Sequence, residues 1–245
     1  PSLVGSEMCI RDRNYIYGGG GVVTNFFSID PDSSRIYMAA TAEDAADGTE
    51  DGRSEIGAIY AIELIDDHNG GLEFQIVNRA TFQGGTGSTP ALSADGQRLY
   101  VSDNVGNVIA LDSELAELWR VDVGEPLVGS ITVAADNNEL YAVTGSDVIQ
   151  LIDKGDHGSR AWTAELTGFD GYANVDVQSN ALTATATANG VVIMMGGGKK
   201  LLGRTLMLHM GMGLLDRETG KLRYFAEGRE DSLAMSVVAA DGSIY

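Results

Sequence analysis

Short apolar runs separated by turn residues dominate the chain. Runs such as Leu-Tyr-Val-Ser (99–102) and Val-Ile-Ala-Leu-Asp (108–112) are rich in Val, Ile, Leu and Tyr, and glycines follow many of them. This arrangement is typical of strands joined by tight turns. Helical periodicity is nearly absent; the best candidate is SELAELWRV (113–121), which is short, and a strand fits its neighbours better. The pattern therefore predicts an all-β protein.

Comparison of the chain with itself reveals a repeated unit. Each unit contains an apolar stretch, a turn such as Ala94-Asp95-Gly96, a Leu-Tyr-hydrophobic strand, a strand ending in Asp, and an outer strand. The outer strand carries Trp119 or Trp162, or Tyr224 and Phe225 in the same place. We place the copies at about 26–80, 88–124, 128–168, 181–228 and 233–245.

The spacing of the repeat predicts its architecture. The anchor residues Tyr37, Tyr100, Tyr141, Ile193 and Tyr245 are 63, 41, 52 and 52 residues apart. With insertions, this fits the ~40–45 residues of one four-stranded propeller blade. In the second copy we expect strands at 89–93, 98–102, 107–112 and 117–123. We expect Trp119 and Trp162 to fill space between neighbouring blades, each burying about 150–250 Å², rather than to stack on a ligand.

The repeat resembles the pyrroloquinoline-quinone-like (PQQ-like) β-propeller repeat. ADGQRLYV (94–101), VIALD (108–112), LLDRETG (214–220) and AADGSIY (239–245) carry the resemblance, which extends over nearly all of 26–245. It implies a partial β-propeller of four-stranded antiparallel blades, about four blades plus the start of another, truncated at both ends. The family includes quinone-dependent alcohol dehydrogenases, a lipoprotein scaffold in outer-membrane barrel assembly, and many secreted proteins, so the fold alone does not fix a function.

Composition narrows the possible partners. The net charge is −19, and a surface this acidic is repelled by phosphate backbones, which argues against nucleic-acid binding. No apolar run reaches the ~18–20 residues of a membrane helix. The single cysteine, Cys9, lies within residues 1–13, which we exclude from the propeller domain for the reason given in the next paragraph. We therefore expect no disulfide, Cys-ligated zinc or thiol nucleophile.

The first thirteen residues differ from the rest of the chain. Residues 2–12, SLVGSEMCIRD, are similar to a translated transposase adapter used in DNA sequencing, so we expect residues 1–13 to be non-native and 14–245 to form the propeller domain. A real exposed N-terminal segment is the alternative. If the adapter reading holds, the natural protein begins upstream, and any signal peptide or lipid anchor lies outside this sequence.

The residues that could carry chemistry do not form a recognisable site. The acidic stretch 42–55 fails as a calcium loop, because Ala58 stands where a closing Glu is needed when the loop is counted from Asp47. The histidines His68, His157 and His209 are dispersed, and we expect packing or surface roles. Glycine runs at 18–21 and 84–89 lack the Lys and following helix of a phosphate loop; the run at 196–200 has lysines, but a strand follows it. We expect all three runs at blade junctions.

The methionines gather in one part of the chain. Copper could bind thioethers, but we expect the following methionines to fill core gaps instead: Met194, Met195, Met207, Met210 and Met212. The quinone enzymes would imply PQQ, calcium, a catalytic aspartate and often a vicinal disulfide, and no residue here matches those positions. We therefore predict no catalytic, cofactor-binding or metal-binding residue.

We expect a non-catalytic scaffold in the periplasm or outside the cell that binds another protein through a propeller face or its loops. Two alternatives stay open. The first is a fragment of a PQQ-dependent dehydrogenase or another propeller enzyme. The second is a propeller that binds a carbohydrate or another polymer in its central funnel.

Overall fold

A computed structural model describes residues 26–41, 56–66, 70–83, 85–127, 129–136, 138–166, 177–180, 183–228, 239 and 241–243. All of the regular secondary structure in these ranges is β-strand. The predictions for residues 1–13, for the acidic stretch 42–55, for His68 and for the glycines at 18–21 lie outside the described residues.

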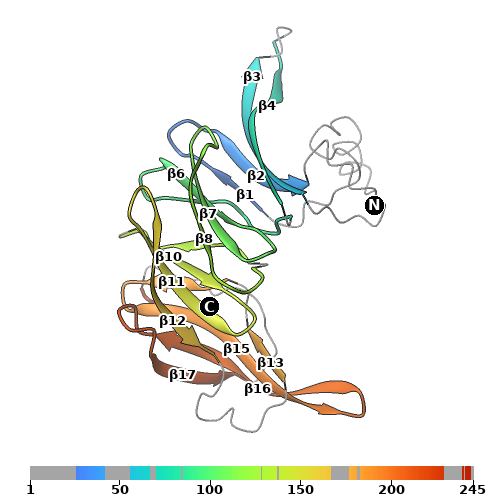
Figure 1. Cartoon of the computed structure of the whole chain (residues 1–245), viewed down its shortest axis with the longest axis vertical. Helices are drawn as coiled ribbons and strands as arrows, with labels where there is room; N and C mark the ends of the chain where they lie inside the picture. Colours follow the sequence, from blue (N-terminus) through green and yellow to red (C-terminus); the bar gives the residue numbers. More distant parts are fainter. Residues whose placement is uncertain are drawn as a thin grey trace.

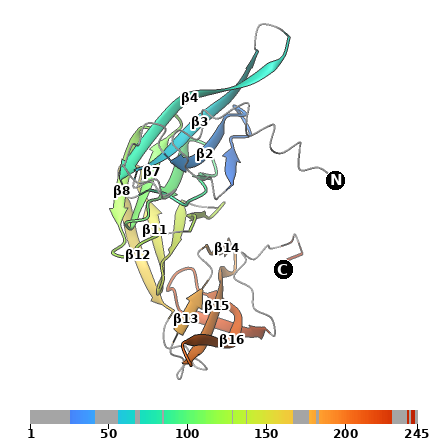
Figure 2. The ribbon, with the colours of Figure 1, turned by 90° about the vertical axis from the view of Figure 1, so that its right-hand side faces the viewer.

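The described strands form four antiparallel sheets, one for each of the four full blades predicted (Figure 1). Most of the predicted start of a fifth blade, 233–245, lies outside the described residues. Blade 1 contains β1 (Phe27–Ile29), β2 (Ile36–Thr41), β3 (Ile56–Asp66) and β4 (Leu72–Gln83); blade 2 contains β5 (Ala91–Leu92), β6 (Arg98–Ser102), β7 (Asn107–Asp112) and β8 (Glu117–Asp122); blade 3 contains β9 (Thr132–Val133), β10 (Glu139–Val143), β11 (Asp147–Asp153) and β12 (Gly158–Glu165); blade 4 contains β13 (Val177–Asn180), β14 (Thr185–Thr187), β15 (Gly190–Leu201), β16 (Arg204–Leu215) and β17 (Leu222–Gly228). The blades follow one another in chain order along a curved stack (Figure 2). The predicted all-β propeller fold is confirmed.

Turn chemistry explains where the strands reverse. Between β5 and β6, Gly96 has a φ of 69°, a conformation that costs other residues more than glycine. The carboxylate of Asp95 accepts hydrogen bonds from the Ser93 hydroxyl at 2.5 Å and from the Gln97 backbone N–H at 3.1 Å. The Ala-Asp-Gly turn predicted from sequence therefore closes the hairpin as expected.

The core lies between the blades. The cluster between blades 2 and 3 joins Tyr100, Val108 and Trp119 to Leu140 and Ile149, and similar clusters join blade 1 to blade 2 and blade 3 to blade 4. A two-layer arrangement of this kind is needed because one sheet cannot bury both of its faces alone. The blades therefore stabilise one another.

The two tryptophans occupy equivalent places at successive junctions. The rings of Tyr100 and Trp119 lie 6.0 Å apart at 41°, and those of Tyr141 and Trp162 lie 5.9 Å apart at 46°. A Cβ on Gly158 would lie 2.7 Å from Trp119, and a Cβ on Gly220 would lie 2.6 Å from Trp162. Each indole thus packs against a glycine of the next blade, which confirms the predicted role of both tryptophans.

Ser and Thr side chains join the innermost strands to one another. The Thr89 N–H donates to the Ser130 hydroxyl at 2.8 Å, and the Ser130 N–H donates to the Thr183 hydroxyl at 3.2 Å. The Thr132 hydroxyl donates to the Ala184 carbonyl at 2.6 Å. These bonds run from blade 2 to blade 4 and fix the spacing of the inner strands.

Blade 4 differs from the prediction in two ways. It has a fifth strand, β13, which pairs with residues 195–198 of β15 and lies before the predicted start of the repeat at 181. The glycines at 196–198 lie inside β15, paired on both sides, rather than at a junction between blades. Both differences arise because β15 and β16 are twelve residues long, more than twice the length of β6 or β10.

None of the described residues belongs to a helix long and apolar enough to cross a membrane.

Candidate functional site

A fully buried carboxylate lies between blades 2 and 3. The Asp153 side chain is fully buried, and its carboxylate accepts hydrogen bonds from Arg98 at 2.5 Å, the Tyr100 hydroxyl at 2.6 Å and the Trp119 indole N–H at 3.1 Å. Burial raises its pKa, but these bonds and one from the Gly155 backbone N–H lower it by more, so the pKa lies below the usual value. Its partners show that this carboxylate holds two blades together.

The neighbouring junctions use backbone acceptors in the same role. Between blades 1 and 2, the Tyr37 hydroxyl donates to the Ser113 carbonyl at 3.2 Å, and Arg35 donates to the same oxygen at 2.9 Å. Between blades 3 and 4, the Trp162 indole donates to the Arg217 carbonyl at 2.8 Å. Arg217 itself forms ion pairs of 2.8 Å with Asp136 and Glu139.

The aromatic hydroxyls at these junctions are held in their neutral form. Burial, followed by the hydrogen bond to Glu139, raises the pKa of Tyr141 to about 12, and burial with the bond to Asp153 raises that of Tyr100 further. Shifted pKa values are common at catalytic sites, but structural networks shift them too. Here each shifted group is bonded inside a junction, so the arrangement is structural.

The remaining residues singled out from the sequence are not brought together. His157 is exposed in the turn after β11, where its ring nitrogen lies 2.6 Å from Asp156. His209 lies in β16, opposite Gly197. Within the described ranges, no three His, Cys, Asp or Glu side chains gather closely enough to hold a metal ion.

The described methionines lie in and beside the core. Met195 and Met210 are buried, and Met194 and Met212 form a cross-strand pair between β15 and β16. Met195 belongs to the apolar cluster between blades 3 and 4, and Met194 packs against it. These positions agree with the gap-filling role that we expect for methionines.

Two long hairpins extend past their neighbouring strands. In blade 1, β2 pairs with β3 only as far as Ile62, so residues 63–66 of β3 and 72–75 of β4 project beyond it (Figure 1). In blade 4, β13 pairs with β15 as far as Gly198, and β17 pairs with β16 only from Met210 onward, so residues 199–209 project. These are the parts of the described structure that lie furthest from a core.

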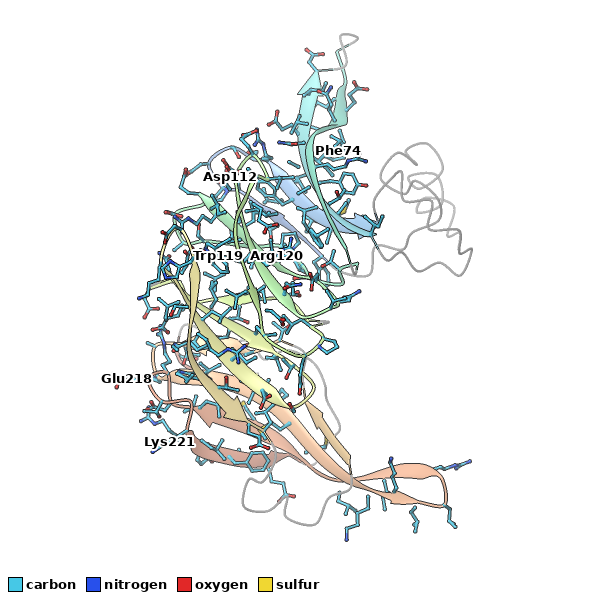
Figure 3. All side chains as sticks on the ribbon, viewed as in Figure 1. Phe74, Asp112, Trp119, Arg120, Glu218 and Lys221 are labelled. Carbon is cyan, nitrogen blue, oxygen red and sulfur yellow. The ribbon has the colours of Figure 1, made fainter. Side chains whose placement is uncertain are left out.

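The first hairpin combines apolar and acidic side chains. Leu64, Leu72, Phe74 and Val77 are 50%, 62%, 42% and 39% exposed, and Phe74 is marked on this hairpin in Figure 3. Glu63, Asp66 and Glu73 lie among them. A shallow hollow of about 400 Å³ adjoins its base and is lined by Tyr60, Ile76, Val77, Asn78 and Arg79.

The sequence analysis did not predict that either hairpin projects and exposes apolar side chains. Alternation within LEFQIV (72–77) or KKLLGRTLML (199–208) indicates strands, but it does not show that the adjacent strand stops earlier. The signal that could have revealed them is the long spacing between anchors, 63 and 52 residues, compared with 41 where blade 3 follows blade 2.

Comparison with known proteins agrees with this architecture. The family model described as "Outer membrane protein assembly factor BamB" matches residues 39–243. The chain belongs to this BamB family. Its PQQ-like repeat, inferred above from the residues, is thereby confirmed.

The solved structures that resemble this BamB-family chain share little sequence identity with it. BamB from Moraxella catarrhalis is 15% identical with a TM-score of 0.45, and the match covers 86% of this chain and 52% of that one. The β-propeller domain of Cps50 (Swd1) from Myceliophteria thermophila is 10% identical with a TM-score of 0.51, covering 88% and 60%. The allergen Mala s 1 from Malassezia sympodialis is 10% identical with a TM-score of 0.46, covering 82% and 63%.

These likenesses concern the fold alone. The chain spans about half to two-thirds of the length of the three solved structures. The comparison with curated proteins found no match.

Proposed function

We propose that this chain is a non-catalytic, extracytoplasmic β-propeller that holds another protein during the assembly of outer-membrane proteins. The observation that carries the proposal is the projecting β3–β4 hairpin, whose exposed apolar side chains serve no blade core. Membership in a family described as an outer membrane protein assembly factor supports the setting and the kind of partner.

The β3–β4 hairpin has the composition of a protein-docking surface. Leu64, Leu72 and Phe74 lie close together on the hairpin. Because the two leucines are 50% and 62% exposed, each would contribute about 1–2 kcal/mol if a partner covered the exposed part. Binding energy at protein interfaces is concentrated in a few well-packed apolar or aromatic side chains. The hollow beside Val77 offers a place for one side chain of the partner.

The chemistry of the buried groups supports a scaffold rather than an enzyme. Asp153, Tyr100 and Tyr141 are bonded between or within blades, where a substrate would have to disrupt the stack to reach them. The same groups account for the rigidity of the array, and a rigid array presents its hairpins in a fixed relation to each other.

Site-specific crosslinking tests the proposal. A photoreactive amino acid replaces Phe74 in protein exported to the cell envelope, and the same residue replaces Glu218 as a control in the exposed β16–β17 turn (Figure 3). We expect position 74 to crosslink to one envelope protein of the outer-membrane assembly machinery, and Leu72→Glu to abolish that product. Failure to crosslink, or equal products from position 218, would refute the proposal.

The two alternative functions predict different products. A PQQ-dependent enzyme would bind PQQ with calcium and oxidise an alcohol, and the crosslink at position 74 would not be specific for an assembly protein. A polymer-binding propeller would yield a carbohydrate adduct from residues near the inner strands rather than a protein adduct from the β3–β4 hairpin.

A further inference from the structure

The β15–β16 hairpin carries a local charge opposite to that of the whole protein. Residues 199–209, KKLLGRTLMLH, contain three cations and no acidic residue, whereas the chain has a net charge of −19. Lys199, Lys200 and Arg204 are all exposed. Clusters of Lys and Arg on an amphipathic element are typical of surfaces that meet anionic lipid headgroups.

Leucines accompany these cations at the end of the hairpin. Leu201 is 60% exposed, Leu202 96%, Leu206 52% and Leu208 45%. Lys199 pairs with Leu206 across the hairpin, and Leu201 pairs with Arg204, so these two cations and two leucines share one face. Lys200, which pairs with Thr205, lies on the other face. An apolar tip surrounded by long cationic side chains suits the boundary between headgroups and acyl chains, because Lys and Arg can keep their charges in the polar layer.

The turn at the tip is unfavourable for the residue that occupies it. Leu202 and Gly203 form a two-residue turn with φ values of 50° and 75°, a geometry in which Asn-Gly or Asp-Gly is preferred. A branched apolar residue with positive φ is strained. Leu115 also has a positive φ, 63°, but it is 5% exposed and packs in the core between blades 1 and 2. Leu202 gains no such packing, so its strain points to a role outside the fold.

The length of the hairpin separates its tip from the acidic body. Leu202 lies four residues beyond Gly198, the last residue of β15 that pairs with β13, which corresponds to about 13 Å of strand. The Debye length at physiological ionic strength is about 8 Å, so screening weakens the repulsion between the acidic blades and an anionic surface about fivefold over that distance. Figure 1 shows this hairpin extending away from the rest of blade 4.

The geometry points to a membrane-docking site: the tip of the β15–β16 hairpin inserts Leu201 and Leu202 into a bilayer surface whose anionic headgroups bind Lys199, Lys200 and Arg204. The occupant is a lipid surface because exposed leucines and cations stand together here without an acidic residue, which complements anionic headgroups above acyl chains, whereas the β3–β4 hairpin carries acidic side chains among its leucines. This site is on a different blade from the protein-docking hairpin and does not depend on it.

Vesicle flotation tests the inference with the full chain. We expect binding to phosphatidylcholine vesicles that contain phosphatidylglycerol and little binding to phosphatidylcholine alone. Replacing Lys199, Lys200 and Arg204 together with Glu should weaken binding at least about a hundredfold, because each cation near an anionic surface contributes about a fivefold factor. Lys221→Glu, a charge reversal at an exposed lysine in the β16–β17 turn, is the control and should leave binding unchanged.

One variant separates membrane binding from folding. Leu202→Asn removes the apolar tip but suits the positive φ, so the protein should fold at least as stably while vesicle affinity falls at least about tenfold. A fluorophore attached at Leu202→Cys, in a Cys9→Ser background, should shift to the blue with anionic vesicles. No binding to anionic vesicles, unchanged binding of Leu202→Asn, or crosslinking of position 202 to an acidic protein in place of lipid would overturn the inference.

Discussion

Replacing Asp153 with Ala should be the most damaging single substitution at a blade junction. The change leaves the Arg98 guanidinium, the Tyr100 hydroxyl and the Trp119 indole N–H without their acceptor in a site where the Asp153 side chain is fully buried. Removing one partner of a buried ion pair costs about 3–5 kcal/mol. For a domain of this size, that corresponds to a fall in melting temperature of about 6–20 °C.

Urea unfolding monitored by tryptophan fluorescence measures this loss, since Trp119 itself contacts the carboxylate. Ser113→Ala is the matched control, because Ser113 holds in blade 2 the position that Asp153 holds in blade 3. Ser113 lies three residues after Ala110, the partner of Tyr100, and Asp153 lies three residues after Gln150, the partner of Tyr141. Ser113, however, contacts blade 1 through its backbone carbonyl. We expect that variant to change stability by less than about 0.5 kcal/mol. A loss below about 1 kcal/mol for Asp153→Ala, or equal losses for both variants, would refute the reasoning.

The pH dependence gives a second test of the same group. Because hydrogen bonds hold the folded pKa of Asp153 below the usual value for an aspartate, its contribution to stability is fully present above that usual value and disappears as the pH falls through the lower, folded pKa. The difference in unfolding free energy between the wild type and Asp153→Ala should therefore be constant near neutral pH and shrink in acid. A difference that grows as the pH falls would contradict the assignment.

Four further predictions follow from the same structure. Gly158→Ala should destabilise the protein by about 1–3 kcal/mol in urea, because its Cβ would lie 2.7 Å from Trp119 and 2.8 Å from Val121. Leu202→Asn should raise the unfolding free energy by about 1 kcal/mol or more, measured by calorimetry; a lower value would show that the turn is unstrained. Titration with PQQ and calcium should show no saturable binding and no alcohol oxidation, whereas micromolar calcium-dependent binding would contradict the scaffold proposal. In hydrogen exchange, amides of residues 88–165 should exchange slowest because blades 2 and 3 are packed on both sides, and uniform protection to both ends would contradict this.

The strands of the fold could be predicted because the repeat supplies several copies of the same pattern. The expected strands 98–102 and 107–112 have the observed bounds of β6 and β7, and the expected 89–93 is shortened to β5, Ala91–Leu92. The register of β6 and β7 could not be predicted from alternation, because side chains on both of their faces are buried. β13 could not be predicted from the repeat, because it pairs with an extension of β15 that the other copies lack.

The junction chemistry and the hairpins were less accessible from sequence. Asp153 ends a strand like any other acidic turn residue, and only the packing of blade 2 against blade 3 brings Tyr100 and Trp119 to it. The exposure of Leu202 depends on where β13 stops pairing with β15 and where β17 stops pairing with β16, which is a property of four strands together. Sequence reasoning instead weighed the histidines and methionines, whose chemistry is recognisable one residue at a time.

The kind of acceptor at each junction affects how the propeller could change by recombination of its repeats. Where blade 2 meets blade 1, the backbone carbonyl of Ser113 accepts the hydrogen bond from the Tyr37 hydroxyl, and every amino acid has a backbone carbonyl. A duplicated or transplanted blade could therefore be inserted there with few matching substitutions. Where blade 3 meets blade 2, the acceptor is the side chain of Asp153, so the two blades must be inherited as a pair. The minimal exchangeable module of this propeller is thus a single blade at the first junction and a two-blade unit at the second.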